Sequence, residues 1–258
     1  MNTSAQGLRV LVTAGAAGIG RAIAQTFLEH GARVHLCDVD AAALAAVREA
    51  LPGATQTRAD VASLADVDRL FADAERALGG LDVLVNNAGI AGPTGRVEDL
   101  RPEDWDRCIA VDLNGMFYCT RRAMPLIKRA GGGSIINLSS VAGRLGFPLR
   151  TPYAAAKWAV VGFTKSLAIE AGPDKVRVNC IQPGNVEGER IDRVIDAKAG
   201  ALGIGAGEMR NRLLDAVSLR TFVSAQDIAN MALFLASAAG RHITGQALSV
   251  CGDVQRTA

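Results

Sequence analysis

The feature that most constrains the fold of this chain is a repeated alternation of two kinds of segment. Short runs rich in β-branched residues and leucine alternate with longer, alanine-rich segments of helical period. This alternation is typical of strand–helix units whose strands form a parallel sheet with helices on both faces. We therefore predict a doubly wound α/β fold, with a parallel sheet of about seven strands and right-handed crossovers.

The periodicity places the expected elements along the chain. Strands are predicted at residues 8–13, 33–38, 54–58, 81–86, 133–139, 176–182 and 247–251. Helices are predicted at residues 18–30, 41–50, 64–78, 102–129, 153–171 and 225–236. With 258 residues, 49% of them hydrophobic and 21% charged, the composition suits a single domain that spans residues 1–258.

Residues 184–219 interrupt the alternation. They carry many glycines and charges, including Glu187, Arg190 and Arg193. The segment follows a strand end, which is where open α/β sheets place their ligand sites. We expect a partly helical insertion that covers the substrate; a plain surface excursion is the alternative reading.

Charge and composition exclude several partners and sites. Lys and Arg number 28 against 26 Asp and Glu, and no basic run appears, so neither nucleic acid nor a membrane surface is an expected partner. No apolar run approaches the roughly 20 residues of a membrane helix. The five cysteines form no CxxC pair and the three histidines have no metal-ligand spacing, so we expect reduced thiols, a cytoplasmic location and no bound metal.

A glycine-rich turn follows the first predicted strand. Bare backbone in such a strand-to-helix turn can approach a diphosphate, and the free amides of the helix start face the anion. Glycines also serve tight turns for steric reasons alone, so the turn by itself is weak evidence. Asp38 strengthens it, because a carboxylate at the end of the second strand can accept hydrogen bonds from both hydroxyls of a ribose. We predict a dinucleotide site at Thr13, Gly15, Gly18, Ile19, Gly20 and Asp38.

Asp38 also distinguishes between two dinucleotides. A carboxylate at this position would repel the phosphate that NADP carries on the same ribose. No Arg or Lys lies between Thr13 and Gly20 to neutralise that phosphate, although Arg33 and Arg48 are close enough in sequence to weaken the argument. NAD is the predicted cofactor and NADP the alternative.

Tyr153 and Lys157 stand four residues apart, so in a helix both project from one face. An ammonium group beside a phenol favours the phenolate and makes the tyrosine a usable acid–base group. Ser140 follows a predicted strand by one residue, where its hydroxyl could hold a reacting oxygen. We predict that Ser140, Tyr153 and Lys157 are catalytic.

Taken in order with three further motifs, these residues make the whole chain resemble the short-chain dehydrogenase/reductase superfamily. The further motifs are Asp60-Val61, Asn86-Asn87-Ala88-Gly89 and Pro183-Gly184. The resemblance implies one Rossmann domain in which hydride moves between the nicotinamide and a substrate carbon. It also implies that Tyr153 exchanges the oxygen-bound proton, that Ser140 orients that oxygen and that Lys157 holds the nicotinamide ribose.

The resemblance also implies an oligomeric assembly and further cofactor-binding residues. Members of the superfamily commonly pair long helices between subunits, so a homo-oligomer, commonly a tetramer, is implied. Cofactor contacts are implied at Asp60, Val61, Asn87, Ala88, Gly89, Tyr153, Lys157, Pro183, Gly184 and Val186.

Three positions depart from the pattern of the superfamily. Ala14 occupies the usual first glycine of the turn, so Gly15 is expected to provide the flexibility. Asp112 stands where an asparagine usually helps a proton relay to the lysine, and Asn114 would lie about 200° away on a regular α-helix. Asp112 is therefore predicted to serve the relay as a carboxylate, unless the relay is altered. Gly188 replaces a threonine that commonly bonds the nicotinamide carboxamide.

The substrate is only loosely constrained. Arg144, Arg150 and Arg190 are predicted substrate contacts, since guanidinium groups match carboxylate, sulfonate or phosphate. An uncharged sugar, polyol or secondary alcohol remains an equal alternative. Rival functions are an NADPH-dependent reductase of 3-oxoacyl thioesters or other carbonyls, and a dinucleotide-binding sensor without catalysis.

Overall fold

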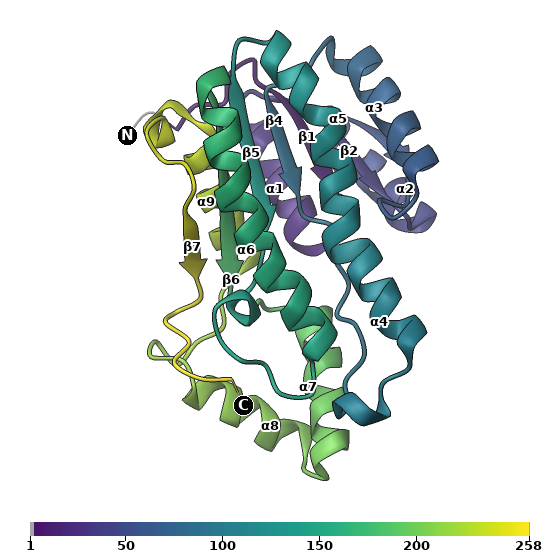
Figure 1. The fold of residues 1–258 in the computed structure, drawn as a ribbon, viewed down its shortest axis with the longest axis vertical. Helices are drawn as coiled ribbons and strands as arrows, with labels where there is room; N and C mark the ends of the chain where they lie inside the picture. The colour runs from purple at the N-terminus through teal and green to yellow at the C-terminus, as the bar shows by residue number, and fades with distance from the viewer. Residues whose placement is uncertain (1–2, 258) are drawn as a thin grey trace.

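The computed structural model describes residues 3–257 and contains one seven-stranded sheet. All strand pairs are parallel, and the strand order is β3-β2-β1-β4-β5-β6-β7. The predicted doubly wound fold is confirmed (Figure 1). The strands are β1 Arg9–Thr13, β2 Arg33–Asp38, β3 Ala54–Arg58, β4 Val83–Asn86, β5 Gly133–Leu138, β6 Val176–Pro183 and β7 Ala247–Val250.

Helices cover both faces of the sheet because successive strand side chains point to opposite sides. Val10 and Val12 of β1 pack towards α1, α2 and α9, whereas Leu11 packs towards α3, α5 and α6. None of the helices within residues 3–257 is long and apolar enough to cross a membrane. The six helices that build these layers are α1 Gly18–Glu29, α2 Ala41–Ala50, α3 Leu64–Leu78, α5 Gly115–Arg129, α6 Thr151–Ala171 and α9 Ala225–Ala236.

The helix predicted over residues 102–129 is not one regular α-helix. It consists of α4 Pro102–Ile109, a π-helical segment Ala110–Asn114, and α5. The widened turn allows Asp112 to be buried and Gly115 to lie against Val61, where a Cβ on Gly115 would be 2.6 Å from Val61 Cγ2. Single π turns inside α-helices often mark functional sites.

The carboxyl ends of the strands meet α7 Glu189–Leu202 and α8 Ala206–Asp215 (Figure 1). These two helices occupy most of residues 184–219, the segment expected to be partly helical. They have a small hydrophobic core of their own, formed by Ile191, Ile195, Ala199, Met209, Leu213 and Phe222. That they cover a substrate stays a prediction.

Candidate active site

The turn between β1 and α1 is shaped by close backbone packing. The amide nitrogen Nδ2 of Asn87 donates to the carbonyl oxygens of Thr13 and Ala14, both at 3.0 Å. A Cβ on Gly20 would lie 2.0 Å from the Ala14 oxygen and 2.5 Å from Asn87 Nδ2, so only glycine fits. Helix α1 begins without a side-chain cap, so its first amides are open to an anion.

The expectation that Gly15 supplies the flexibility of the turn is wrong. Ala14 itself adopts the left-handed conformation, with φ of 49°, and Gly15 does not. Gly15 is required for packing, because a Cβ there would lie 2.7 Å from the Cβ of Leu36 on β2. The chain therefore tolerates strain at Ala14 that a glycine would relieve.

Asp38 ends β2 beside this turn, and its carboxylate lines the cleft at the carboxyl edge of the sheet. Its two oxygens accept from the backbone amides of Ala16 and Asp40, each at 3.2 Å. Arg33 does not reach it, because the Arg33 guanidinium donates to Leu78 O at the opposite end of the strand.

Arg58 is a basic residue near Asp38 that the sequence reading missed. It pairs with Asp38 in the register of β2 and β3, and its Nε donates to Val39 O at 3.1 Å. Twenty residues separate the two side chains in sequence, so their proximity follows only from the strand register.

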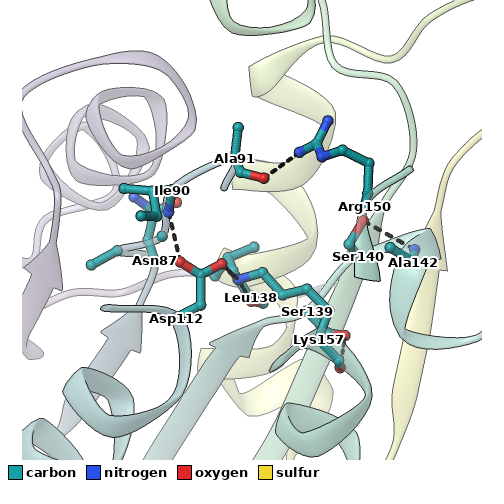
Figure 2. Close-up of polar contacts among 12 residues, drawn as sticks. Asn87, Ile90, Ala91, Asp112, Leu138, Ser139, Ser140, Ala142, Arg150 and Lys157 are labelled. Atoms are coloured by element: carbon teal, nitrogen blue, oxygen red, sulfur yellow. Dashed lines mark hydrogen bonds and ion pairs between the residues drawn. The ribbon is translucent and has the colours of Figure 1, made fainter. Parts of the chain in front are cut away.

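Lys157 points from α6 towards the cleft and is buried (Figure 2). Its Nζ lies 5.5 Å from the centre of the Tyr153 ring and donates to Leu138 O at 3.1 Å. The predicted juxtaposition of Tyr153 and Lys157 is present, and both line the cleft.

Asp112 lies behind Lys157 rather than in the cleft wall. Its Oδ2 is 3.3 Å from Lys157 Nζ, and its Oδ1 accepts from the Ile90 amide at 2.7 Å (Figure 2). A Cβ on Gly89 would lie 3.1 Å from Lys157 Nζ, so Gly89 gives this pair its space. Asp112 thus contacts Lys157 directly, and its part in a proton relay stays a prediction.

Ser140 follows β5 and lines the same cleft. Its Oγ accepts from the Ala142 amide at 3.1 Å, which leaves the hydroxyl hydrogen available to a substrate oxygen. The neighbouring Ser139 donates to Lys157 O at 2.8 Å and so connects the β5 loop to α6. Ser140, Tyr153, Lys157 and Asp38 therefore share one cleft of about 570 Å³.

The other predicted cofactor residues divide into two groups. Those that line the cleft are Gly18, Ile19, Asn87, Gly89, Pro183, Gly184 and Val186. Those that do not line it are Thr13, Gly15, Gly20, Asp60, Val61 and Ala88.

Residues of the second group have structural contacts. Thr13 Oγ1 accepts from the amides of Asn87 and Ala88, each at 3.0 Å, and so ties β1 to the β4 loop. Asp60 pairs with Arg107 at 2.9 Å. Gly188 lines the cleft with φ of 124°, which favours glycine over the threonine implied by resemblance.

Of the three arginines predicted to contact the substrate, only two line the cleft. Arg144 does not line the cleft; it donates to Val254 O at 2.9 Å and fixes the carboxyl-terminal segment. Arg150 and Arg190 do line it, and Arg190 donates to Gly89 O at 3.0 Å. Lys198 of α7, absent from the predicted site, lines it as well.

The pKa values in the cleft reflect this crowding of cations. Burial, followed by repulsion from Arg150, lowers the pKa of Lys198 to about 8. Burial is also the main cause that lowers the pKa of Arg150, with a contribution from Arg190.

Two features of the cleft fit a nicotinamide dinucleotide. The uncapped start of α1 can accept a diphosphate, and Asp38 can accept the hydroxyls of a ribose. Tyr153 and Lys157 line the same cleft.

Comparisons with known proteins agree with this geometry. A family model described as enoyl-(acyl carrier protein) reductase matches residues 14–253. A short-chain type dehydrogenase/reductase of Sinorhizobium fredii is 35% identical over 95% of this chain and 97% of its own length. Galactitol 2-dehydrogenase of Agrobacterium fabrum is 36% identical, over 94% and 95% of the two chains.

A third relative and a solved structure are also similar to this chain. The 3-oxoacyl-[acyl-carrier-protein] reductase of Chlamydia muridarum is 36% identical, over 98% of this chain and all of its own. The crystal structure of levodione reductase superposes with a TM-score of 0.89 at 28% identity, covering 96% of this chain and 97% of the other.

Proposed function

The chain belongs to the short-chain dehydrogenase/reductase superfamily, and from this premise we propose that it is an NAD-dependent oxidoreductase that interconverts a secondary alcohol and a ketone. The proposed substrate is a sugar, a polyol or a hydroxy acid, and the similarity to a galactitol dehydrogenase supports a polyol. The observation that carries the proposal is the convergence of Ser140, Tyr153 and Lys157 in one cleft with Asp38.

The side chains divide the proton chemistry among them. A bound nicotinamide dinucleotide supplies or accepts the hydride. Tyr153 takes the hydroxyl proton during oxidation and returns it during reduction. Lys157 places its ammonium group 5.5 Å from the centre of the Tyr153 ring, where its charge stabilises the negative charge that develops on the phenol oxygen during proton transfer. Ser140 donates its free hydroxyl hydrogen to the reacting oxygen and orients it.

The preference for NAD rests on Asp38. A carboxylate in the cleft favours a ribose with free hydroxyls and repels a ribose phosphate. We expect the Asp38→Ser variant to lose at least about tenfold in its NAD over NADP ratio of kcat/KM, because the carboxylate that repels the ribose phosphate is removed while Arg58 remains on the neighbouring strand. Asp40→Asn, which keeps the oxygen that caps α2, is the matched control and should leave the ratio unchanged.

A reductase of 3-oxoacyl thioesters is the second candidate. The description of the matching family model and the relative from Chlamydia muridarum favour it. It would use NADPH, and Asp38 argues against that cofactor.

A substrate screen tests the proposal. Purified protein is assayed by NADH or NADPH absorbance against secondary alcohols, polyols, hydroxy acids and 3-oxoacyl thioesters. Turnover of a small alcohol or ketone with NAD preferred supports the proposal. Thioester reduction with NADPH preferred supports the second candidate instead, whereas tight dinucleotide binding without any turnover supports a sensor.

A further inference from the structure

Cationic side chains from α7 and from the residue that precedes α6 line the cleft. We call Arg150, Arg190 and Lys198 the cationic end of the cleft, since all three line it. Arg150 and Lys198 are only 2% and 1% exposed. The ring of Phe147 lies close to both, with its centre 5.9 Å from Arg150 Cζ and 4.5 Å from Lys198 Nζ.

The burial of Arg150 is costly for the folded chain alone. An arginine is rarely buried unless it is paired, because removing its charge from water is energetically unfavourable. Arg150 donates to Ala91 O, but its Nε is buried without a hydrogen-bond partner (Figure 2). Within residues 3–257, no carboxylate lies within 4.0 Å of the Arg150 guanidinium as an ion pair.

The cations also repel one another. The charge of Arg150 contributes to the lowered pKa of Lys198, and the charge of Arg190 to that of Arg150. Glu189, which lines the cleft nearby, pairs with Arg193 at 3.4 Å. A bound anion would offset both the repulsion among the cations and the cost of burying Arg150.

We infer that the substrate carries a carboxylate, which binds between Arg150 and Lys198 and directs the reacting carbon towards Tyr153. The inference rests on the proposed function and narrows its substrate class to a hydroxy acid and the matching keto acid. Arg150 Cζ lies 5.1 Å from the centre of the Tyr153 ring, so only a few carbon atoms separate the carboxylate from the reacting carbon. The Phe147 ring offers those carbons an apolar wall.

Binding of unreactive carboxylates tests the site apart from catalysis. Acetate, butyrate and hexanoate are titrated into the protein by calorimetry, with and without NADH, each against its primary amide. Acid and amide have nearly the same shape but differ in charge. We expect at least one carboxylate to bind about tenfold or more tightly than its amide, because a buried charged site discriminates strongly against a neutral analogue.

Variants of Lys198 assign the effect to the cationic end of the cleft. Lys198→Met keeps the length of the side chain without its charge and should reduce the preference for acid over amide to less than about threefold. Lys198→Arg should restore it. Lys165→Met, on the exposed side of α6, is the matched control and should bind as the unaltered protein does.

The pH dependence gives a second readout. The pKa of Lys198 is about 8, so its charge is present below that pH and is lost above it. Carboxylate affinity should therefore fall as pH rises through about 8, and Lys198→Arg should remove this fall. If the fall disappears in Lys198→Arg, it is caused by Lys198 and not by another ionisable group nearby. The other charged or titratable groups of the cleft and its rear wall are Arg150, Arg190, Arg193, Glu187, Glu189, Asp38, Asp112, Cys108, Tyr153 and Lys157.

The outcomes distinguish this inference from the proposed function. Equal affinity for acid and amide, no binding of any carboxylate, or a preference that survives Lys198→Met would overturn the inference. The proposed function would still stand if NADH-linked turnover depended on Tyr153. Conversely, if the protein bound carboxylates but turned over no alcohol or ketone, the anion site would be supported and the proposed function would be contradicted.

Discussion

Asp112 is the residue at which this chain departs most in charge from the pattern of its superfamily. Its carboxylate makes two contacts, one with the Ile90 amide and one with Lys157 Nζ. An asparagine could keep the first contact but would bring no charge to the second. We therefore expect Asp112 to be a positioning residue that acts on Tyr153 through Lys157.

The Asp112→Asn variant tests this role. Without the carboxylate, Lys157 loses the ion pair that holds its Nζ beside Tyr153. We expect kcat for alcohol oxidation to fall at least about tenfold, while the KM for the substrate changes less than about threefold. Asp106→Asn, at an exposed position on α4, is the control. An unchanged kcat would remove Asp112 from the mechanism.

Ala14 offers a test of strain in the cofactor turn. Its φ of 49° costs an alanine roughly 1–2 kcal/mol, whereas glycine adopts it freely. Because glycine also makes the unfolded chain more flexible, Ala14→Gly should raise the free energy of unfolding by a few tenths to about 1 kcal/mol. Urea denaturation measures it. Ala45→Gly, in the exposed middle of α2, should change stability in the opposite direction by about 1 kcal/mol, and a loss of stability in both variants would contradict the account.

Sequence reasoning reached the residues proposed as catalytic because their spacing is local. Tyr153 and Lys157 share one helix, so the period of the helix alone predicts that they lie together. Lys198 and Arg58 were missed because each comes near the site only through tertiary packing or strand register. Arg144 was placed in the site by its position in sequence, yet its side chain turns to the carboxyl-terminal segment.

At the scale of elements, the strands were predictable and the interruption of a helix was not. Buried parallel strands are short apolar runs bounded by turns, and each predicted strand agrees with the structure to within two residues. The π-helical segment Ala110–Asn114 has no such signal, since it depends on the contacts that Asp112 and Gly115 make with distant residues. Helix α6 begins at Thr151, two residues before its predicted start, because Pro152 suits a first turn.

The pairing of β2 with β3 predicts an acid-sensitive contact. His35 lies buried between Thr55 and Thr57, at 2.8 Å and 3.1 Å, and burial lowers its pKa from 6.5 to about 4. The fold therefore requires neutral His35, and its contribution is fully present above pH 6.5 and is lost as pH falls towards about 4. The loss amounts to about 3 kcal/mol at most.

Urea denaturation across this pH range checks the prediction. The stability advantage of the unaltered protein over His35→Gln should shrink as pH falls from 6.5 to about 4. His242→Gln, at an exposed position, is the matched control. A difference between the protein and His35→Gln that does not change with pH would contradict it.

At the scale of the whole molecule, we expect a homo-oligomer, as the resemblance implies. Trp158 and Ile169 of α6 are 51% and 81% exposed, and they stand three helical turns apart on one side of the helix. Ile169→Asp and Trp158→Glu should each lower the mass measured by light scattering, while Lys175→Glu, outside the helix, should not. A monomeric unaltered protein would contradict the expectation.

The most direct test of the whole account is the activity of Tyr153→Phe, which removes one oxygen atom from the cleft. With the best substrate of the screen, kcat should fall at least about 100-fold while NADH affinity changes less than about threefold. Tyr118→Phe, the same change at the other tyrosine of the chain, should keep full activity. A Tyr153→Phe variant that turned over substrate as fast as the unaltered protein would show that this phenol is not the acid–base group.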